Sequence, residues 1–417
     1  MPQIAPGAVA DPRAIVRVGA CRPSFQPLPE LLLRIALVCD GFTSFGGADR
    51  VVETLLQLYP SADLFALVDF VPQLARAGLG GRSVRTTFLQ RLPFARRRFR
   101  AYLPLYPLAV ESIDLRGYDL VISAQFAAAH GVITHPFQPH IAHISSPMRY
   151  AWDLQADHLE LAGMRGARSA FARYLLHRLR LWDYAAGQRP DVLVANSHFV
   201  AERVRKYYRR ESVVIHPPVA LDRFSADAGH DGFYLSLGRL VPHKRVDLIV
   251  DAFAASPARR LIVAGGGPLL ATLRASAPPN VAFVGEVDED EAARLMSRAR
   301  AFIHAAVEDF GIAPLEAQAA GTPVIAHGRG GLTETIVPVG AARPTGLFFA
   351  EQTAASLREA IDRFEALGEG AISAVDCRTN AERFDADRFR RAFAATVDAE
   401  VARQADAARG LGGTARR

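Results

Sequence analysis

Short apolar runs bounded by turn residues alternate with segments of helical periodicity along most of the chain. Continuous apolar runs of this length are typical of strands in a parallel sheet that is buried on both faces. The helical segments between them would cover those two faces. In the first half, strands are predicted at Leu31–Cys39, Asp63–Val68, Tyr118–Ser123, Ile141–Ser145, Asp191–Asn196 and Val213–His216, and the first helix at Val51–Leu58.

The same rhythm restarts after residue 217. Gly232–Arg239 is an apolar run that ends in glycine and arginine, and the segment after it has a helical apolar face. Further strands are predicted at Asn280–Gly285, Ala301–Ile303, Pro323–Ala326 and Gly346–Phe349. Two successive α/β patterns predict a doubly wound protein with these parts: a flexible extension at 1–30, domains at 31–217 and 218–395, and a C-terminal helix end and tail at 396–417.

The composition agrees with two folded domains. Of 417 residues, 50% are hydrophobic and 24 are phenylalanine, which is enough for two cores. No stretch reaches the about 18 apolar residues of a membrane span, and residues 1–30 lack the apolar core of a secretory signal. The three cysteines have no metal-ligand spacing. We therefore expect a cytoplasmic protein.

The net charge of +6 favours anionic partners such as phosphorylated substrates, nucleic acid or acidic lipids. Leu89–Leu105 interleaves arginines with aromatic residues, and Arg165–Arg180 is a similar but less aromatic stretch. Either stretch suits the inner face of the plasma membrane, with rings in the lipid and guanidinium groups at the headgroups. A solvated basic helix fits equally well. No nucleic-acid-binding module is recognisable, so nucleic acid is not predicted as a partner.

The stretch AFIHAAVEDFGIAPLEAQAAGTPVIAHGRGG, residues 301–331, holds the densest candidate chemistry. An exposed turn at Glu308–Gly311 precedes a helical segment at Pro314–Ala320, with Glu316 inside it. Backbone N–H groups around Gly311 and Ile312 would be unpaired at the helix start and would suit a phosphate. Two carboxylates beside an anion site indicate a nucleotide-sugar, although acids near a helix start also serve as dipole partners.

Two cations are predicted at the same crevice. Arg239 ends a strand and Lys244 precedes the next helix, and ligands of open α/β sheets collect at the carboxyl ends of strands. Both could neutralise a diphosphate. Lys244 is one of only two lysines among 49 basic residues, which hints that a compact ammonium is required there. The alternative is a pair of exposed loop cations.

Two other segments follow strand ends in the first half. The Gly46-Gly47 pair after the first strand would let the backbone approach a phosphate or sugar, or would simply form a tight turn. In HISSPMRYAWD, His143 is placed to reach a substrate, although a lone histidine is more often structural.

Two tempting motifs are rejected. RLIVAGGGP lacks the G-x-G-x-x-G spacing of a dinucleotide site. Asp288-Glu289-Asp290 is interpreted as an N-cap and first turn of a helix that ends near Arg300, rather than as a metal site. No metal and no other cofactor are expected.

Three motifs together carry a family resemblance. Glu308 and Glu316, followed by GTPVIAHGRGG and Glu334, resemble the donor-site motif of the retaining GT-B glycosyltransferases. GRLVPHKRVDL resembles their diphosphate motif, and HISSPMRYAWD the acceptor-side motif of bacterial mannosyltransferases that build O-antigen and exopolysaccharide. The resemblance, over residues 33 to about 395, implies a GT-B fold with a C-terminal helix that crosses back to the first domain.

The resemblance also implies a function. We expect a metal-independent, retaining transfer of a hexose, first of all mannose from GDP-mannose, to a saccharide on a polyprenyl diphosphate. Retention would come from front-face attack, since no carboxylate is obviously poised as a nucleophile. The open alternatives are a UDP-sugar donor, a GT-B epimerase or phosphorylase, and a non-catalytic sugar-nucleotide-binding protein.

The implied roles are specific to residues of this chain. His143, Arg149 and Tyr150 belong to the acceptor side, and Glu308, His143, Arg239 and Lys244 to catalysis. The expected donor contacts are Gly46, Gly47, Arg239, Lys244, Glu308, Phe310, Gly311, Ile312 and Glu316.

Overall fold

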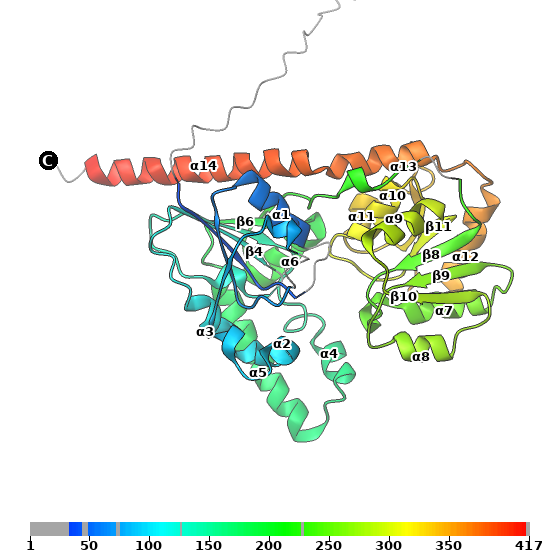
Figure 1. Ribbon diagram of the computed structural model, residues 1–417, viewed down its shortest axis with the longest axis horizontal. Coiled ribbons are helices and arrows are strands. Elements are labelled where there is room, and N and C mark those ends of the chain that lie inside the picture. Colours follow the sequence, from blue (N-terminus) through cyan, green and yellow to red (C-terminus); the bar gives the residue numbers. More distant parts are fainter. Residues whose placement is uncertain (1–32, 44–48, 72–75, 126, 227–228, 414–417) are drawn as a thin grey trace, which may run out of the picture. The chain divides into compact units, whose positions relative to one another are not determined.

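The computed structural model describes residues 33–43, 49–71, 76–125, 127–226 and 229–413. From Arg34 onward the chain forms one compact unit that holds two sheets, each flanked by helices (Figure 1). The predicted extension at 1–30 and the Gly46-Gly47 pair lie outside the described residues.

The first sheet has seven parallel strands in the order β3-β2-β1-β4-β5-β6-β7. The six predicted strands all form: β4 and β5 keep their predicted lengths but are shifted by one or two residues, and the other four are shorter than predicted. The additional strand, β3, has three residues of intermediate or exposed burial, so its sequence carries no apolar signal. The strands are β1 Ile35–Cys39, β2 Asp63–Ala66, β3 Val84–Thr86, β4 Leu120–Gln125, β5 His140–Ile144, β6 Val192–Ala195 and β7 Val213–Val214; the helices are α1 Asp49–Leu58, α2 Ala95–Arg98, α3 Tyr106–Glu111, α4 Gln155–Leu161, α5 Gly166–Ala186 and α6 His198–Tyr208.

The second sheet has six parallel strands in the order β10-β9-β8-β11-β12-β13. Asp288 is the N-cap of α9, where its side chain accepts the Glu291 amide, as predicted. The strands are β8 Phe233–Leu237, β9 Arg260–Ala264, β10 Val281–Gly285, β11 Ala301–His304, β12 Val324–His327 and β13 Gly346–Phe349; the helices are α7 Val246–Ala254, α8 Leu270–Ala275, α9 Glu289–Arg298, α10 Ile312–Ala319, α11 Leu332–Thr335, α12 Ala354–Ala366, α13 Ala374–Ala381 and α14 Ala386–Gly413.

Each sheet reverses its strand order beside its first strand. In the second sheet, β8 lies between β9 and β11, so the loops after β8 and β11 leave the same edge in opposite directions. Such a switch point opens a crevice at the carboxyl ends of the strands, where ligands of this architecture bind. Of the predicted donor residues that the structure describes, five lie on these two loops (Arg239, Lys244, Glu308, Phe310 and Gly311) and two lie in the following helix α10 (Ile312 and Glu316).

The closing helix returns to the first domain. Phe389, Phe393 and Val397 of α14 are buried in the same apolar cluster as Leu37 of β1 and Leu55 of α1. The 28-residue helix is continuous through residue 395, where the sequence suggested a boundary (Figure 1). The C-terminal helix thus crosses back as the resemblance implied.

The basic stretch Leu89–Leu105 is not a single helix. It forms a 3-10 turn at Phe88–Arg91, the one-turn α2 and a second 3-10 segment at Phe99–Leu105. Pro93 and Pro104 interrupt helical hydrogen bonding. The second basic stretch does form a continuous helix, α5. None of the helices in the described ranges is long and apolar enough to cross a membrane.

Candidate donor site at the switch point of the second sheet

Glu308 is the centre of the site. Its Oε1 lies 2.5 Å from Lys244 Nζ on the β8 side and 2.8 Å from His304 Nε2 at the end of β11. The Glu308 side chain is 17% exposed. Burial alone would raise the pKa of Glu308, but Lys244 and His304 outweigh it and hold the pKa well below its usual range. Glu308 is therefore an ionised carboxylate at neutral pH.

The loop after Glu308 leads into an uncapped helix. Gly311, at φ 98°, is the N-cap of α10, and no side chain among the described residues accepts a hydrogen bond from the first amides of this helix. A Cβ on Gly311 would lie 2.4 Å from Leu332 Cδ2, so both the backbone conformation and the packing require glycine. Unpaired amides at a helix start favour an anion.

Arg239 lies on the loop after β8. It is exposed, and its guanidinium has no ion pair or hydrogen bond among the described residues. The glycine run after β9 supports this loop: a Cβ on Gly265 would lie 2.0 Å from Gly238 O, and one on Gly267 2.5 Å from Leu240 O. The run that resembled a dinucleotide motif thus allows close packing under the loop that carries Arg239.

Glu316 lies one helical turn into α10 and is half-buried, with no hydrogen bond or ion pair within the described ranges. Burial raises the pKa of Glu316, and the charges of Arg50 and Arg223 partly offset this. Both arginines pair with Glu289 of α9, at 3.1 Å each. Glu316 is thus an unpaired carboxylate in a partly dehydrated position.

The donor-site loops also contact the first domain. Asp309 carboxylate oxygens lie 3.3 Å from Arg149 Nη1 and 3.5 Å from Arg203 Nη1. Ser197 Oγ donates to the Asp309 carbonyl at 2.5 Å. The residue beside Glu308 therefore ties the donor loop to the segments after β5 and β6.

Glu334, at the start of α11, makes a second contact between the donor-site loops and the first domain. Its carboxylate accepts the amides of His198 and Phe199, at 2.9 Å each, at the N-terminus of α6. His216 Nε2 lies 3.1 Å away. Burial alone would raise the pKa of Glu334, but these three hydrogen bonds lower it.

The acceptor-side residues are more dispersed. His143 of β5 is 1% exposed, and neither ring nitrogen has a hydrogen-bond partner among the described residues. Its ring packs edge-on against Phe389 of α14, with centroids 6.1 Å apart, and burial lowers its pKa to about 4. The Tyr150 hydroxyl is buried and has no hydrogen-bond partner within the described ranges, and Arg149 pairs with Asp309. Among the described residues, Arg149 is the one of the three that forms an ion pair with a donor loop.

Phe310 is a core residue in this structure. It is 3% exposed, and its ring stacks on His216 and meets Phe384 edge-on. Sequence inspection missed His304, Asp309 and Arg203. The spacing of four between His304 and Glu308 at a strand end could have indicated His304, whereas no local spacing indicates the Asp309–Arg203 pair.

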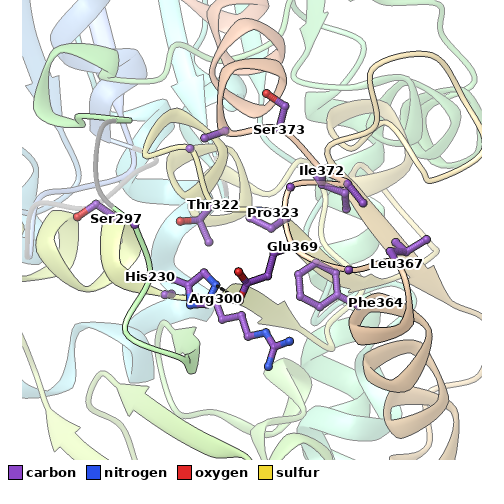
Figure 2. Close-up of a pocket in the computed structure, with 17 residues that line it drawn as sticks. His230, Ser297, Arg300, Thr322, Pro323, Phe364, Leu367, Glu369, Ile372 and Ser373 are labelled. Atoms are coloured by element: carbon purple, nitrogen blue, oxygen red, sulfur yellow. Dashed lines mark ion pairs between the residues drawn. The ribbon is translucent and has the colours of Figure 1, made fainter.

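Two cavities flank the second sheet. One, of about 590 Å³, lies beside the donor site and is lined by Arg149, His158, His243, Arg245 and Val307, among others. The other, of about 430 Å³, opens at the amino ends of β8, β11 and β12, and His230 faces Glu369 across it (Figure 2). Three residues that line the first cavity, His243, Arg245 and Val307, are neighbours of Lys244 and Glu308 in the chain. Among the residues described, no cluster of three His, Cys, Asp or Glu side chains could hold a metal.

Comparisons with known proteins agree with this geometry. Residues 220–384 match the family Glycosyl transferases group 1. A GDP-mannose-dependent monoacylated alpha-(1-6)-phosphatidylinositol monomannoside mannosyltransferase of Corynebacterium glutamicum is 31% identical over 183 residues, 36% of this chain and 48% of that protein. A GDP-mannose-dependent alpha-(1-6)-phosphatidylinositol monomannoside mannosyltransferase of Mycobacterium tuberculosis is 36% identical over 149 residues, 29% and 39% of the two chains. The matches span less than half the length of these relatives.

Solved structures match over a longer range. HepE of Anabaena, crystallised with UDP and glucose, has a TM-score of 0.63 at 18% identity and covers 88% of this chain and 99% of its own. Sucrose-phosphate synthase of Thermosynechococcus elongatus has a TM-score of 0.62 at 19% identity, with 90% and 100% covered. The fold is thus that of the GT-B glycosyltransferases. The match to Glycosyl transferases group 1, at residues 220–384, spans less than half of the chain.

Proposed function

We propose that this protein is a retaining glycosyltransferase that moves mannose from GDP-mannose to a saccharide acceptor. The observation that carries the proposal is the Lys244–Glu308 contact beside the uncapped start of α10. It joins a cation for a diphosphate, a carboxylate for sugar hydroxyls and free amides for a phosphate in one crevice. The mannosyl choice is supported by the GDP-mannose-dependent relatives.

In this proposal the donor residues act on the leaving group. The bond between the sugar C1 and the diphosphate oxygen breaks, and negative charge develops on the diphosphate. Arg239, Lys244 and the amides at Gly311 and Ile312 stabilise that charge. Glu308 accepts hydrogen bonds from the donor sugar hydroxyls, and Glu316 those of the ribose diol.

The acceptor hydroxyl attacks C1 from the face that the diphosphate leaves, and its proton passes to a diphosphate oxygen. This front-face route retains the anomeric configuration without an enzyme nucleophile. The ties of Asp309 and Glu334 to the first domain hold the donor loops against it, which excludes water and disfavours hydrolysis.

We place the acceptor side at Arg149 and Tyr150, beside the cavity of about 590 Å³. His143 belongs to this assignment only if α14 moves, since Phe389 covers its ring. The transfer is proposed to need no metal, because Arg239 and Lys244 can supply the counter-charge for the diphosphate. We expect full turnover after treatment with EDTA. A loss of turnover that added Mg²⁺ restores would overturn the metal-independent mechanism.

A lipid-linked acceptor would bring the protein to the inner face of the membrane. Exposed Phe171, Tyr174, Leu181 and Tyr184 project from α5. The exposed arginines of the same helix have no ion pair among the described residues, and its single acid, Asp183, is buried. This chemistry suits anionic headgroups. Cosedimentation with phosphatidylglycerol vesicles, lost at high salt and in Phe171→Ser, is expected; equal binding to phosphatidylcholine vesicles would count against it.

The test of the donor is a thermal-stability panel of GDP-mannose, GDP-fucose, UDP-glucose, GDP and UDP, followed by transfer assays. A ligand at about 100 times its Kd adds about 2.7 kcal/mol of stability. We expect a GDP-selective shift that Arg239→Ala and Lys244→Ala abolish. Arg260→Ala, an exposed arginine at the opposite edge of the sheet, is the matched control. A UDP-selective shift would mean that the donor is a UDP-sugar instead of GDP-mannose. Binding of a donor without transfer would favour a non-catalytic protein.

A further inference from the structure

One oxygen of Glu308 takes two donors. Oε1 lies 2.5 Å from Lys244 Nζ and 2.8 Å from His304 Nε2. Since an ionised carboxylate only accepts hydrogen bonds, His304 Nε2 must carry the proton of the second contact. Oε2 has no hydrogen-bond partner among the described residues, so it is the oxygen available to a ligand.

Lys244 is needed in two places once the donor binds. In the proposed function its ammonium neutralises the diphosphate, which requires it to loosen its contact with Glu308. The Glu308 carboxylate, at 17% exposure, would then lose its main counter-charge in a partly dehydrated site. A second, fixed donor would keep the carboxylate ionised and oriented.

His304 has the rigidity for that task. It is the last residue of β11 and is 7% exposed. Its ring stacks on Phe302, two residues earlier on the same face of the strand, with centroids 6.3 Å apart and planes 11° apart. A ring held in this way keeps Nε2 aimed at Oε1 whether or not Lys244 is present.

We propose that His304 is a positioning residue for Glu308. Its Nε2–H holds Oε1 throughout the reaction, so that Oε2 faces the donor sugar while Lys244 is released to the diphosphate. This inference rests on the proposed function and adds to it how the donor carboxylate stays in place. His304 itself touches neither sugar nor phosphate.

The activity test compares His304→Leu with His304→Gln. Leucine fills the space without a donor, whereas glutamine offers an amide N–H. Loss of a hydrogen bond to a charged group predicts a fall of about 10- to 100-fold in kcat/KM for the sugar donor in His304→Leu. GDP has no sugar for Glu308 to bind, so the Kd of GDP should differ by less than about twofold between His304→Leu and the wild type. His304→Gln should recover most of the loss.

His327→Gln is the matched control. His327 ends the neighbouring strand β12, is 4% exposed and packs against Phe349, and its described interactions include no hydrogen bond or ion pair with Glu308. Its kcat/KM should stay near that of the wild type. Unchanged turnover in His304→Leu would overturn the proposal. A parallel loss of GDP binding and thermal stability in His304→Leu would also overturn it, because that pattern marks a purely structural role.

A measurement without turnover separates this inference from the proposed function. In protein labelled with ¹⁵N-histidine, the Nε2 resonance of His304 should shift on Glu308→Ala, and it should persist when GDP binds. An Nε2 signal that is insensitive to Glu308→Ala overturns the positioning role. Absence of transfer from any donor, with the shift intact, overturns the proposed function alone.

Discussion

Removing Lys244 should expose how strongly Glu308 depends on it. Lys244→Met keeps the length of the side chain but removes the charge that lies 2.5 Å from Glu308 Oε1. Glu308→Gln keeps the shape of the other partner and removes its charge. The double variant removes both charges and leaves no unpaired ion, so the three proteins and the wild type form a thermodynamic cycle.

The burial of the Lys244 and Glu308 side chains sets the size of the expected loss in stability. At 27% and 17% exposure, the pair lies between a surface pair and a fully buried one. Surface pairs contribute about 0–1 kcal/mol, and removal of one partner from a buried pair destabilises by about 3–5 kcal/mol. We expect each single variant to lose about 1–3 kcal/mol and the double variant to lose less than the sum.

Acid denaturation gives an independent check with a definite sign. The folded-state pKa of Glu308 is depressed, so its contribution to stability is present above the unfolded value of about 4.3 and is lost as pH falls through the folded value. Lys244→Met should weaken that loss on acidification.

The assay is urea denaturation of the four proteins without ligand at pH 7, repeated below pH 4. Effects that add to within about 0.5 kcal/mol would refute the reasoning, because the two side chains would then be uncoupled in solution. Nucleotide binding should remain lost in the double variant even where stability recovers, since the diphosphate still lacks its ammonium.

Three further predictions concern other parts of the chain. Burial raises the pKa of Glu316, so Glu316→Gln should stabilise the unliganded protein by about 0.5–2 kcal/mol, measured by denaturation. The same variant should bind GDP more weakly, measured by calorimetry. A destabilised variant would contradict this prediction. Burial raises the pKa of Asp183 to about 7, so the folded state holds a proton that the unfolded state has lost above about pH 4, and stability falls as pH rises toward 7 by at most about 1.4 kcal/mol per pH unit. Asp183→Asn should flatten that slope in denaturation series at pH 5 and 7. Phe393 of α14 is fully buried, so Phe393→Ala should lower the free energy of unfolding by about 3–5 kcal/mol. It should also speed the cleavage of α14 in a trypsin time course. An unchanged cleavage rate would mean that this ring does not anchor the helix.

The local pattern of apolar and turn residues was enough to predict much of the fold. Strands such as β1 and β11 were predicted because an apolar run between turn residues reports burial directly. The Asp288 N-cap was predictable because its hydrogen bond to the Glu291 amide joins residues three apart. Glu308 and Lys244 were placed in one crevice because the switch point follows from the order of strands and helices alone.

Tertiary structure decided what those residues touch. Arg149 and Asp309 are 160 positions apart, and no periodicity links them. The burial of His143 under Phe389 depends on where α14 lies, which is a property of packing between distant segments. Leu89–Leu105 was interpreted as a stretch for an anionic membrane surface or as a solvated basic helix, yet it forms two 3-10 segments and a one-turn helix. Sequence by itself placed Glu308 and Lys244 at the crevice. Only the folded chain decided their partners and brought in His304 and Asp309, since hydrogen bonds and ion pairs act over a few ångströms of space rather than over a spacing in sequence.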